Sequence, residues 1–271
     1  MIKLLIFWDI FWRNWRRLVN KYLPELKNKY NPDFILWNSE NITSWKWPVL
    51  KHILEMKELW FDCLTWWDHT FSNLKDIKDY INEKDSIQIR PLNYYESRFY
   101  KVPWKWFKVI EKDWKKLLVI NLIGSAFIWG QSFNPFIKVD EILNEFQNEK
   151  FDGIIVDFHR ETTAEIYAMS EFLNGRISMI FWTHTHVQTN DEHILSNWTG
   201  MITDVWMIWS FHSSIGQTFE TRLPQFISGL NIFWERPEQD LWLWCINWIF
   251  VEIEDFKCVK LEKIKIIEED K

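Results

Sequence analysis

The chain carries the segment FWTHTHVQTND at Phe181–Asp191, directly after the apolar run Ile177–Phe181. His184 and His186 stand two residues apart in it, and alternate side chains of an extended segment project to the same side. Both imidazoles can then face one point, and neutral imidazole is a common ligand of zinc, iron, copper and nickel. A pair of surface histidines at a strand end is the alternative. The segment predicts a metal site if other strand ends supply further ligands.

Around this segment, apolar runs of strand length alternate with helical patterns. Strands are expected at Lys3–Phe7, Asp33–Trp37, Phe61–Thr65, Phe107–Glu111, Lys116–Leu122, Gly153–Asp157, Ile177–Phe181, Met201–Val205, Trp248–Ile253 and Lys257–Ile267. Helices are expected at Arg13–Lys29, Pro48–Leu59, Asn73–Asn82, Val139–Phe146, Thr163–Leu173 and Phe219–Ile227. This alternation predicts an α/β fold in which ligands gather at the carboxyl ends of parallel strands. Because the sequence has no linker and no internal repeat, we expect a single domain spanning residues 1–271.

Several of these strands end next to potential metal ligands. The strand ends present Asp9, Glu40, Asp68, His69, His159, His184 and His186. Carboxylates mixed with imidazoles suit borderline ions such as Mn, Fe or Zn, and the set is too large for one structural zinc. Taken singly, each residue has a structural explanation, such as a helix cap for Asp9 or a solvated turn for Glu40. Together they predict two ions about 3.5–4 Å apart, able to activate water for displacement at phosphorus.

Composition and charge exclude other classes of protein. The chain has 271 residues, 47% of them hydrophobic, and a net charge of -6 without a long basic stretch, which argues against an extended nucleic-acid footprint. Its three cysteines are widely spaced within apolar runs, as expected for buried thiols in a reducing compartment. The N-terminus lacks signal-peptide form, and the longest apolar run, Leu117–Trp129, is too short for a membrane span. We therefore expect a cytoplasmic protein without membrane association.

The candidate ligands lie in blocks that resemble a known family. The blocks are Trp8-Asp9-Ile10, Asn38-Ser39-Glu40-Asn41, Asp68-His69-Thr70, Val156-Asp157-Phe158-His159 and Thr183-His184-Thr185-His186-Val187-Gln188-Thr189. In this order they resemble the blocks of the calcineurin-like metallophosphoesterases, and more narrowly of the bacterial YmdB-type branch. The likeness covers nearly the whole chain and extends to Arg90-Pro91-Leu92-Asn93-Tyr94, Asn134-Pro135-Phe136 and Ile202-Thr203-Asp204-Val205.

The resemblance implies a four-layer α/β/β/α sandwich with two mixed sheets flanked by helices. It implies a phosphodiesterase that hydrolyses cyclic nucleotides or similar small phosphodiesters with metal-activated hydroxide and two divalent transition-metal ions, Fe, Mn or Zn. Asp9 and His186 would hold the first ion, Asp68, His159 and His184 the second, and Glu40 would bridge them. Asn41 would support a metal ligand or contact the substrate phosphate, and His69 would give a proton to the leaving group as general acid.

The chain departs from the family pattern at three positions. Asp68 stands where Asn is usual, Arg160 where Ala is usual and Ile166 where Lys is usual. Asp68 remains a viable ligand, whereas the other two leave the choice of substrate open. Two further functions stay open: a nucleotide phosphomonoesterase on the same centre, and a regulatory protein that binds a phosphate ligand or a partner without turnover. The oligomeric state is also open, and a homo-oligomer is compatible with the sequence.

Tryptophan and glycine occur in unusual numbers, 21 and 7. Average usage would give about 19 glycines. Fifteen tryptophans, here called the glycine-position tryptophans, fall where the resembling family tends to have glycine: Trp8, Trp12, Trp15, Trp45, Trp47, Trp60, Trp67, Trp104, Trp106, Trp114, Trp182, Trp198, Trp206, Trp209 and Trp248. With only three alanines and abundant Lys, Asn and Ile, the gene is expected to be AT-rich. We hypothesise that UGA codons meaning glycine were translated as tryptophan; genuine tryptophan enrichment is the alternative. The hypothesis predicts several tryptophans at positive φ.

Overall fold

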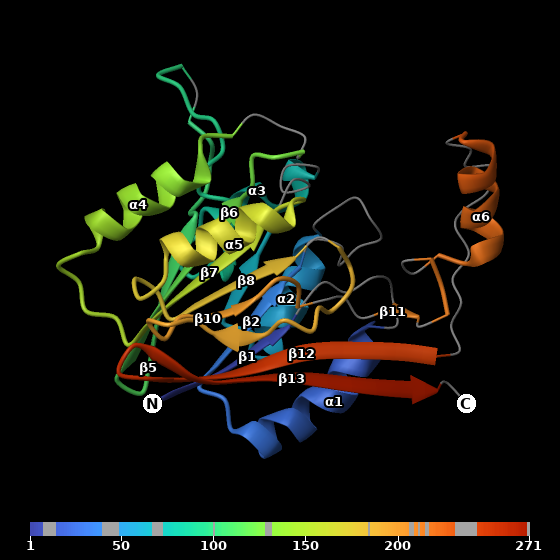
Figure 1. Ribbon diagram of the computed structural model, residues 1–271, viewed down its shortest axis with the longest axis horizontal. Coiled ribbons are helices and arrows are strands. Elements are labelled where there is room, and N and C mark those ends of the chain that lie inside the picture. Colours follow the sequence, from blue (N-terminus) through green and yellow to red (C-terminus); the bar gives the residue numbers. More distant parts are fainter. Residues whose placement is uncertain are drawn as a thin grey trace.

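The computed structural model describes residues 1–7, 15–39, 49–66, 73–99, 101–127, 132–183, 185–205, 209–210, 212–214, 217–230 and 243–269. Its helices are α1 (Trp15–Tyr30), α2 (Leu50–Glu58), α3 (Leu74–Ile81), α4 (Pro135–Glu145), α5 (Thr163–Phe172) and α6 (Phe219–Ser228). The alternation of strands and helices that the sequence predicts is therefore present in the described residues (Figure 1).

The strands form two mixed sheets. The first runs in the order β11 (Trp209–Ser210), β12 (Leu243–Glu254), β1 (Ile2–Phe7), β2 (Phe34–Asn38), β3 (Cys63–Thr65) and β4 (Gln88–Ile89), with β13 (Lys257–Glu269) paired to β12. The second runs in the order β5 (Phe107–Lys112), β6 (Lys115–Ile123), β7 (Gly153–His159), β8 (Met179–Thr183), β10 (Gly200–Ile202) and β9 (His193–Ile194). Strands β1 to β4 are parallel, as are β6, β7, β8 and β10, so each sheet gathers several carboxyl ends at one edge.

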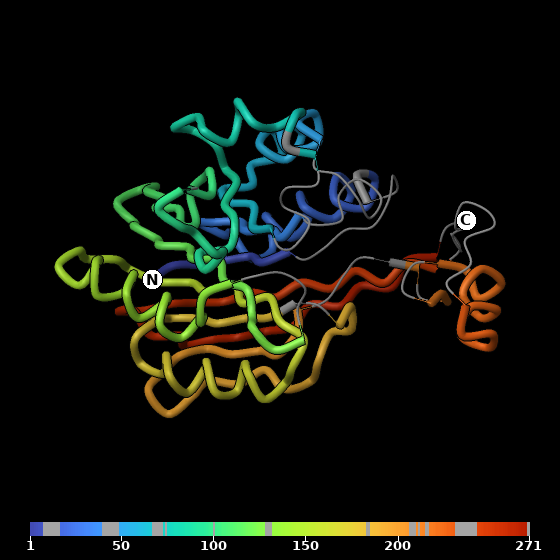
Figure 2. The backbone as a smooth tube through the Cα atoms, turned by 90° about the horizontal axis from the view of Figure 1, so that it is seen from above, coloured from blue at the N-terminus to red at the C-terminus, as the bar shows by residue number. Residues whose placement is uncertain are grey.

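The two sheets pack face to face between two layers of helices. Because side chains alternate along a strand, β1 places Leu4 and Ile6 in the core between the sheets and Leu5 and Phe7 in the core beneath α1, α2 and α3. A third core joins the second sheet to α4 and α5. Figure 2 shows the blue and cyan helices on one side of the sheets and the yellow-green helices on the other. This arrangement confirms the four-layer α/β/β/α sandwich.

Most expected elements are present within a few residues of their predicted bounds, with one informative shift. The sequence predicts a helix from Val139, but α4 begins at Pro135. Asn134 caps it, because its side chain accepts hydrogen bonds from the backbone N–H groups of Phe136 and Ile137. Proline suits the first turn, where its missing N–H costs no helical hydrogen bond.

Ile166, one of the three positions that depart from the family pattern, is buried in the core between α5 and the second sheet. Its side chain therefore contributes to the packing of this core.

Four glycine-position tryptophans adopt positive φ, as the recoding hypothesis predicts. They are Trp60 (70°), Trp104 (88°), Trp114 (66°) and Trp198 (70°). A Cβ atom disfavours this region, and such a conformation costs about 1–3 kcal/mol per residue. The typical free energy of unfolding of a protein is about 5–15 kcal/mol, so four such residues would lower it by a large fraction.

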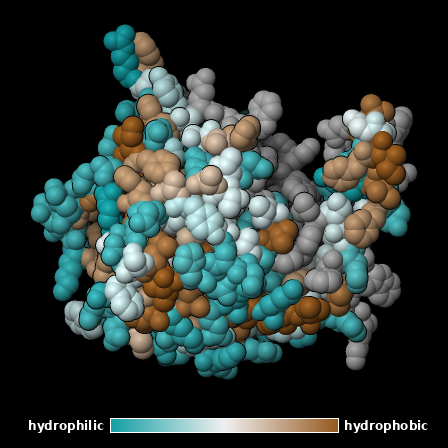
Figure 3. Space-filling view, in the orientation of Figure 1, coloured by the Kyte–Doolittle hydropathy of each residue, from teal (hydrophilic) through white to brown (hydrophobic). Residues whose placement is uncertain are grey.

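Helix α6 lies away from the sandwich, at the side of the molecule where β12 begins and β13 ends (Figures 1 and 2). None of its described residues is buried, and Phe219, Leu223, Phe226 and Ile227 expose apolar side chains, which form a brown patch in Figure 3.

No described helix is long and apolar enough to cross a membrane. Cys63, Cys245 and Cys258 are free and buried, as predicted for thiols within apolar runs.

Candidate functional site

The carboxyl ends of the two sheets meet. The side-chain amide of Asn38, at the end of β2, donates a hydrogen bond to Oδ2 of Asp157 on β7 at 3.4 Å. The amide of Asn121 on β6 donates to the carbonyl of Trp66, one residue beyond β3. The carboxyl ends of β2 and β3 in the first sheet therefore lie against β7 and β6 in the second.

Two of the predicted site residues lie within the described part of the chain, and six lie outside it. His159 and His186 are described; Asp9, Glu40, Asn41, Asp68, His69 and His184 are not. In the sequence, Asp9 and Glu40 stand two residues after β1 and β2, and Asp68 three residues after β3. These three positions thus follow adjacent parallel strands of the first sheet.

His159 is the last residue of β7 and is buried, with 2% of its surface exposed. It stands in register with Ile123 of β6 and Thr183 of β8, the residue before His184. Its carbonyl accepts the backbone N–H of Gly124 at 2.6 Å. A Cβ at Gly124 would lie 2.6 Å from Cβ of Arg160, so glycine is required for this close approach. The buried imidazole is therefore held at the strand ends, where the sequence predicts it.

The prediction that His184 and His186 share an extended segment is wrong for the described residues. Strand β8 ends at Thr183, and the chain bends at Thr185–Val187. His186 is half-buried and has φ of 61°, which is uncommon for a residue other than glycine and tends to occur at functional sites. The imidazole of His186 is thus aimed by a turn, and strand alternation does not determine its direction.

Asp204 holds this turn. Its Oδ2 atom accepts the backbone N–H of Thr185 at 2.8 Å and the Thr185 hydroxyl at 2.6 Å. The backbone of Asp204 also exchanges hydrogen bonds with Thr189, whose N–H donates to its carbonyl at 3.1 Å. The fully buried Asp204 lies just after β10, which pairs with β8. Asp204 belongs to one of the sequence blocks that resemble the family, but the sequence alone indicates no role for it, because its partners Thr185 and Thr189 are not its neighbours in the chain.

Asp157 is a second buried carboxylate whose role the sequence alone does not indicate. Burial raises its pKa to about 8, and hydrogen bonds from Thr65 and Asn38 act in the opposite direction. Both of these partners belong to the first sheet, whereas Asp157 belongs to the second. Asp157 stands two residues before His159 on β7, so the two side chains share one face of the strand. This spacing is the sequence signal that could have identified Asp157 as a link between the sheets.

Arg160 follows His159 and is fully buried. Its guanidinium carbon lies 3.3 Å from the centroid of the Trp182 ring, and its nitrogens have no hydrogen-bond acceptor among the described residues. Burial lowers the pKa of Arg160 to about 9, against the effect of the nearby Glu165 carboxylate. A cation with this little compensation is unusual in a protein interior.

The donor set fits a transition-metal centre, although the described residues alone do not complete one. No group of three or more potential metal ligands occurs within the described ranges, where only His159 and His186 of the predicted ligands lie. His159 is nevertheless a buried imidazole at the edge where the strand ends meet. Imidazole joined to the carboxylates of Asp9, Glu40 and Asp68 is a ligand combination that suits Mn, Fe or Zn.

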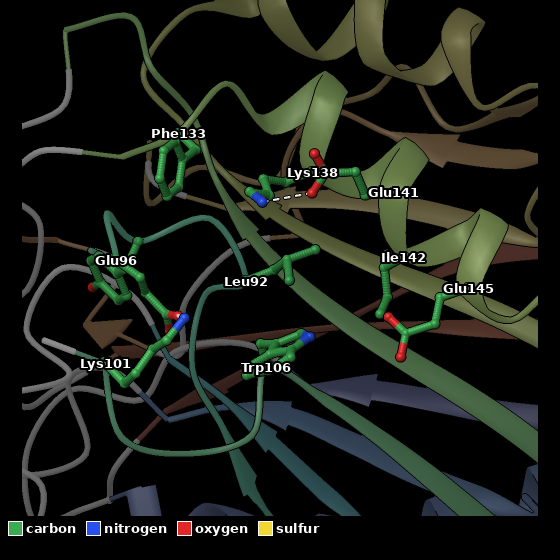
Figure 4. A pocket seen from close by; sticks show the side chains of 10 residues that line it. Leu92, Glu96, Lys101, Trp106, Phe133, Lys138, Glu141, Ile142 and Glu145 are labelled. Atoms are coloured by element: carbon green, nitrogen blue, oxygen red, sulfur yellow. Dashed lines mark hydrogen bonds and ion pairs between the residues drawn. The ribbon is translucent and has the colours of Figure 1, made fainter. Parts of the chain in front are cut away.

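A cavity of about 360 Å³ lies elsewhere, between α4 and the segment 92–106 (Figure 4). Glu96, Glu141 and Glu145 line it together with Lys101, Lys138 and the rings of Trp106 and Phe133. None of the predicted site residues is part of its wall, and the mixed charges favour no ligand class.

Comparison with known proteins identifies the family. A family model described as YmdB-like protein matches residues 5–265. The chain belongs to the YmdB-like family. The resemblance seen in the sequence blocks is thereby confirmed.

Similar proteins extend this result over the full length of the YmdB-like chain. The 2′,3′-cyclic-nucleotide 2′-phosphodiesterase of Bacillus subtilis is 33% identical over 267 residues, which cover 98% of this chain and 97% of that protein. The crystal structure of a novel phosphatase from Mycoplasma pneumoniae has a TM-score of 0.85 and 31% identity, and the match covers 99% of this chain and 94% of that one. A hypothetical protein from Thermus thermophilus has a TM-score of 0.86 at 27% identity, with 98% of this chain and 100% of that one covered.

Proposed function

We propose that this chain is a phosphodiesterase that hydrolyses 2′,3′-cyclic nucleotides or similar small phosphodiesters at a centre of two divalent transition-metal ions. The observation that carries the proposal is the hydrogen bond from Asn38 to Asp157, which joins the end of β2 in the first sheet to β7 in the second, whose last residue is the candidate ligand His159. The similarity to the Bacillus subtilis phosphodiesterase supports the substrate class. The free, buried cysteines support a cytoplasmic location, and we propose a single domain over residues 1–271.

The proposed ligand set is that of the sequence analysis. Asp9 and His186 would hold one ion, Asp68, His159 and His184 the other, and Glu40 would bridge them. When bound, the two ions would supply an activated water and stabilise negative charge on the phosphate. Asn41 would hold a ligand or the substrate phosphate, and His69 would protonate the departing oxygen. The sandwich would keep these groups fixed, because most of them follow strands of the two packed sheets.

A substrate panel combined with metal analysis tests this function. The chain with glycine at the fifteen glycine-position tryptophans is expected to contain two metal ions and to hydrolyse bis-p-nitrophenyl phosphate and 2′,3′-cyclic nucleotides faster than p-nitrophenyl phosphate. A preference for p-nitrophenyl phosphate would favour the nucleotide phosphomonoesterase. Stoichiometric metal without turnover across the panel would favour a regulatory binding protein, and a chain that stays free of metal in excess Mn²⁺ would contradict the proposal.

A further inference from the structure

We propose that the native residue at the fifteen glycine-position tryptophans is glycine, decoded from UGA codons. Seven of these positions have described side chains: Trp60, Trp104, Trp106, Trp114, Trp182, Trp198 and Trp248. Each of the seven either adopts positive φ or buries an indole N–H that finds no acceptor among the described residues. Glycine would relieve both conditions. This inference concerns the identity of the chain and does not depend on the proposed function.

Trp60 ends a helix in a motif that favours glycine. Leu59 is the C-cap residue of α2, and Trp60 follows it. The N–H of Trp60 donates to the Lys57 carbonyl at 3.1 Å, and the N–H of Phe61 donates to the Met56 carbonyl at 3.2 Å. These two hydrogen bonds define a Schellman motif, in which the left-handed position is usually glycine because that residue has no Cβ. In this chain the position holds an indole that is 70% exposed, and Lys27 Nζ lies 5.4 Å from its ring centroid.

Trp114 and Trp198 occupy two different hairpin loops, and each holds the tryptophan at a left-handed position that favours glycine. Asp113 and Trp114 join β5 to β6 as a two-residue loop with φ of 46° and 66°, which is the type I′ geometry that favours Asp-Gly. In the connection from β9 to β10, the N–H of Trp198 donates to the Leu195 carbonyl, and the N–H of Leu195 donates to the Thr199 carbonyl. This is a three-residue loop whose last position is left-handed, a site where glycine is preferred.

Three other tryptophans enclose the indole N–H group at a cost in hydrogen bonding. The indole nitrogens of Trp106, Trp182 and Trp248 are enclosed without an acceptor in the described part of the chain. Trp66, which is outside the glycine-position set, donates its indole N–H to the Ser39 hydroxyl. Trp182 also stands directly before the segment Thr183–His186, and its ring covers the guanidinium of Arg160. Glycine at 182 would open space beside the Arg160 guanidinium.

Positive φ alone does not select tryptophan, because Phe127 and Phe256 adopt it as well. The assignment to a codon rests on three observations taken together: tryptophan is in excess, glycine is scarce, and the affected turns are of glycine-favouring types. UGA differs from the glycine codon GGA by one base and from the tryptophan codon UGG by one base. A single decoding rule therefore accounts for all fifteen positions, whereas independent substitutions would need fifteen separate causes.

The direct test uses the native protein and its gene. We expect UGA codons at Trp60, Trp104, Trp114 and Trp198, and UGG codons at Trp37, Trp66 and Trp244, which lie outside the glycine-position set. Peptide mass spectrometry of protein from the cells that carry the gene should find glycine at the first group and tryptophan at the second. UGG codons at the first group, or tryptophan in its peptides, would overturn the proposal.

A recombinant series isolates the backbone contribution. In the chain with glycine at all fifteen positions, alanine is introduced singly at positions 60, 114 and 198. Glycine and alanine both lack an indole and differ by the Cβ atom. We therefore expect each alanine to lower the melting temperature by about 2–4 °C, which measures the cost of a Cβ at positive φ. Trp37→Gly is the control: Trp37 is buried with Phe7 and Phe61, so glycine there should lower the melting temperature. Equal melting temperatures for glycine and alanine at all three turns would count against glycine as the native residue.

An independent observation supports a second inference, which rests on the proposed function. We infer that Asp204 is a positioning residue for His186. One carboxylate oxygen receives both the backbone N–H and the hydroxyl of Thr185, the residue between the two histidines, and Asp204 itself is fully buried. The turn that sets His186 at φ of 61° is thus tied to the strand next to β8. Loss of this anchor would allow the His186 side chain to sample other directions.

The test measures metal affinity separately from folding. In the glycine-containing chain, Asp204→Ala is expected to weaken Mn²⁺ binding by about 10–100-fold, as is typical when a residue that orients a ligand is removed. Thr185→Val should weaken it less, because only the hydroxyl contact is lost, and Thr185→Ser should restore the native affinity. If the unmutated chain binds no Mn²⁺, the proposed function fails together with this role. If it binds Mn²⁺ and a folded Asp204→Ala chain binds equally well, only the positioning role fails.

Discussion

Replacing His159 by alanine is expected to remove one of two bound metal ions and to lower phosphodiester hydrolysis by about 10²–10³-fold. His159 is buried at the end of β7, in register with the residue before His184, so it is held where the second ion is proposed to bind. The loss of one ion removes charge stabilisation worth several kcal/mol at the transition state, and each 1.36 kcal/mol corresponds to about a tenfold change in rate. Metal content by elemental analysis and kcat on bis-p-nitrophenyl phosphate are the two measurements.

His193→Ala is the matched control for this substitution. His193 is an exposed histidine of β9 whose ring nitrogen contacts the Asp191 carbonyl at 2.7 Å, and it matches no predicted ligand position. The His193→Ala chain should keep both metal ions and full activity. A His159→Ala chain that is folded and still holds its full metal content would remove His159 from the ligand set. One ion per chain before and after the substitution would contradict the two-metal centre.

The sequence predicted the order of elements well because most core strands are long apolar runs. Strands such as β1 and β7 are buried on both faces between a helical layer and the other sheet, so their sequences are almost continuously apolar. The short strands β4, β9 and β11 were missed, because two-residue strands such as Gln88–Ile89 carry no periodic signal. Long-range pairing to a neighbouring strand creates these elements.

The site was predictable in composition and only partly in geometry. The ligand types and their places after strands could be predicted, because a parallel sheet gathers its carboxyl ends at one edge. The turn at His186 could not be predicted, since it depends on Asp204, which is far along the chain from Thr185. The same holds for the contact from Asn38 to Asp157, which joins the two sheets across 119 positions. Both contacts become visible only when the sheets are packed together.

Replacing His69 by alanine is expected to lower kcat by about 10²–10⁴-fold on substrates with poor leaving groups, such as nucleotide alkoxides, and far less on p-nitrophenyl esters. The physical reason is that an alkoxide must be protonated as it departs, whereas p-nitrophenolate leaves readily without a proton. His69 lies outside the described residues, and its role comes from the resemblance of Asp68-His69-Thr70 to the family block. The measurement is the ratio of kcat values on 2′,3′-cyclic nucleotides and bis-p-nitrophenyl phosphate.

Two comparisons separate proton donation from metal binding. Because His69 is proposed to be free of the ions, His69→Ala should retain the full metal content, whereas His159→Ala should lose one ion. The pH dependence gives a second check: the basic limb that reports a protonated general acid should disappear from the cyclic-nucleotide profile of His69→Ala. Equal losses of kcat on both leaving groups, or a reduced metal content, would assign His69 to the metal centre and leave the departing oxygen to be protonated by solvent.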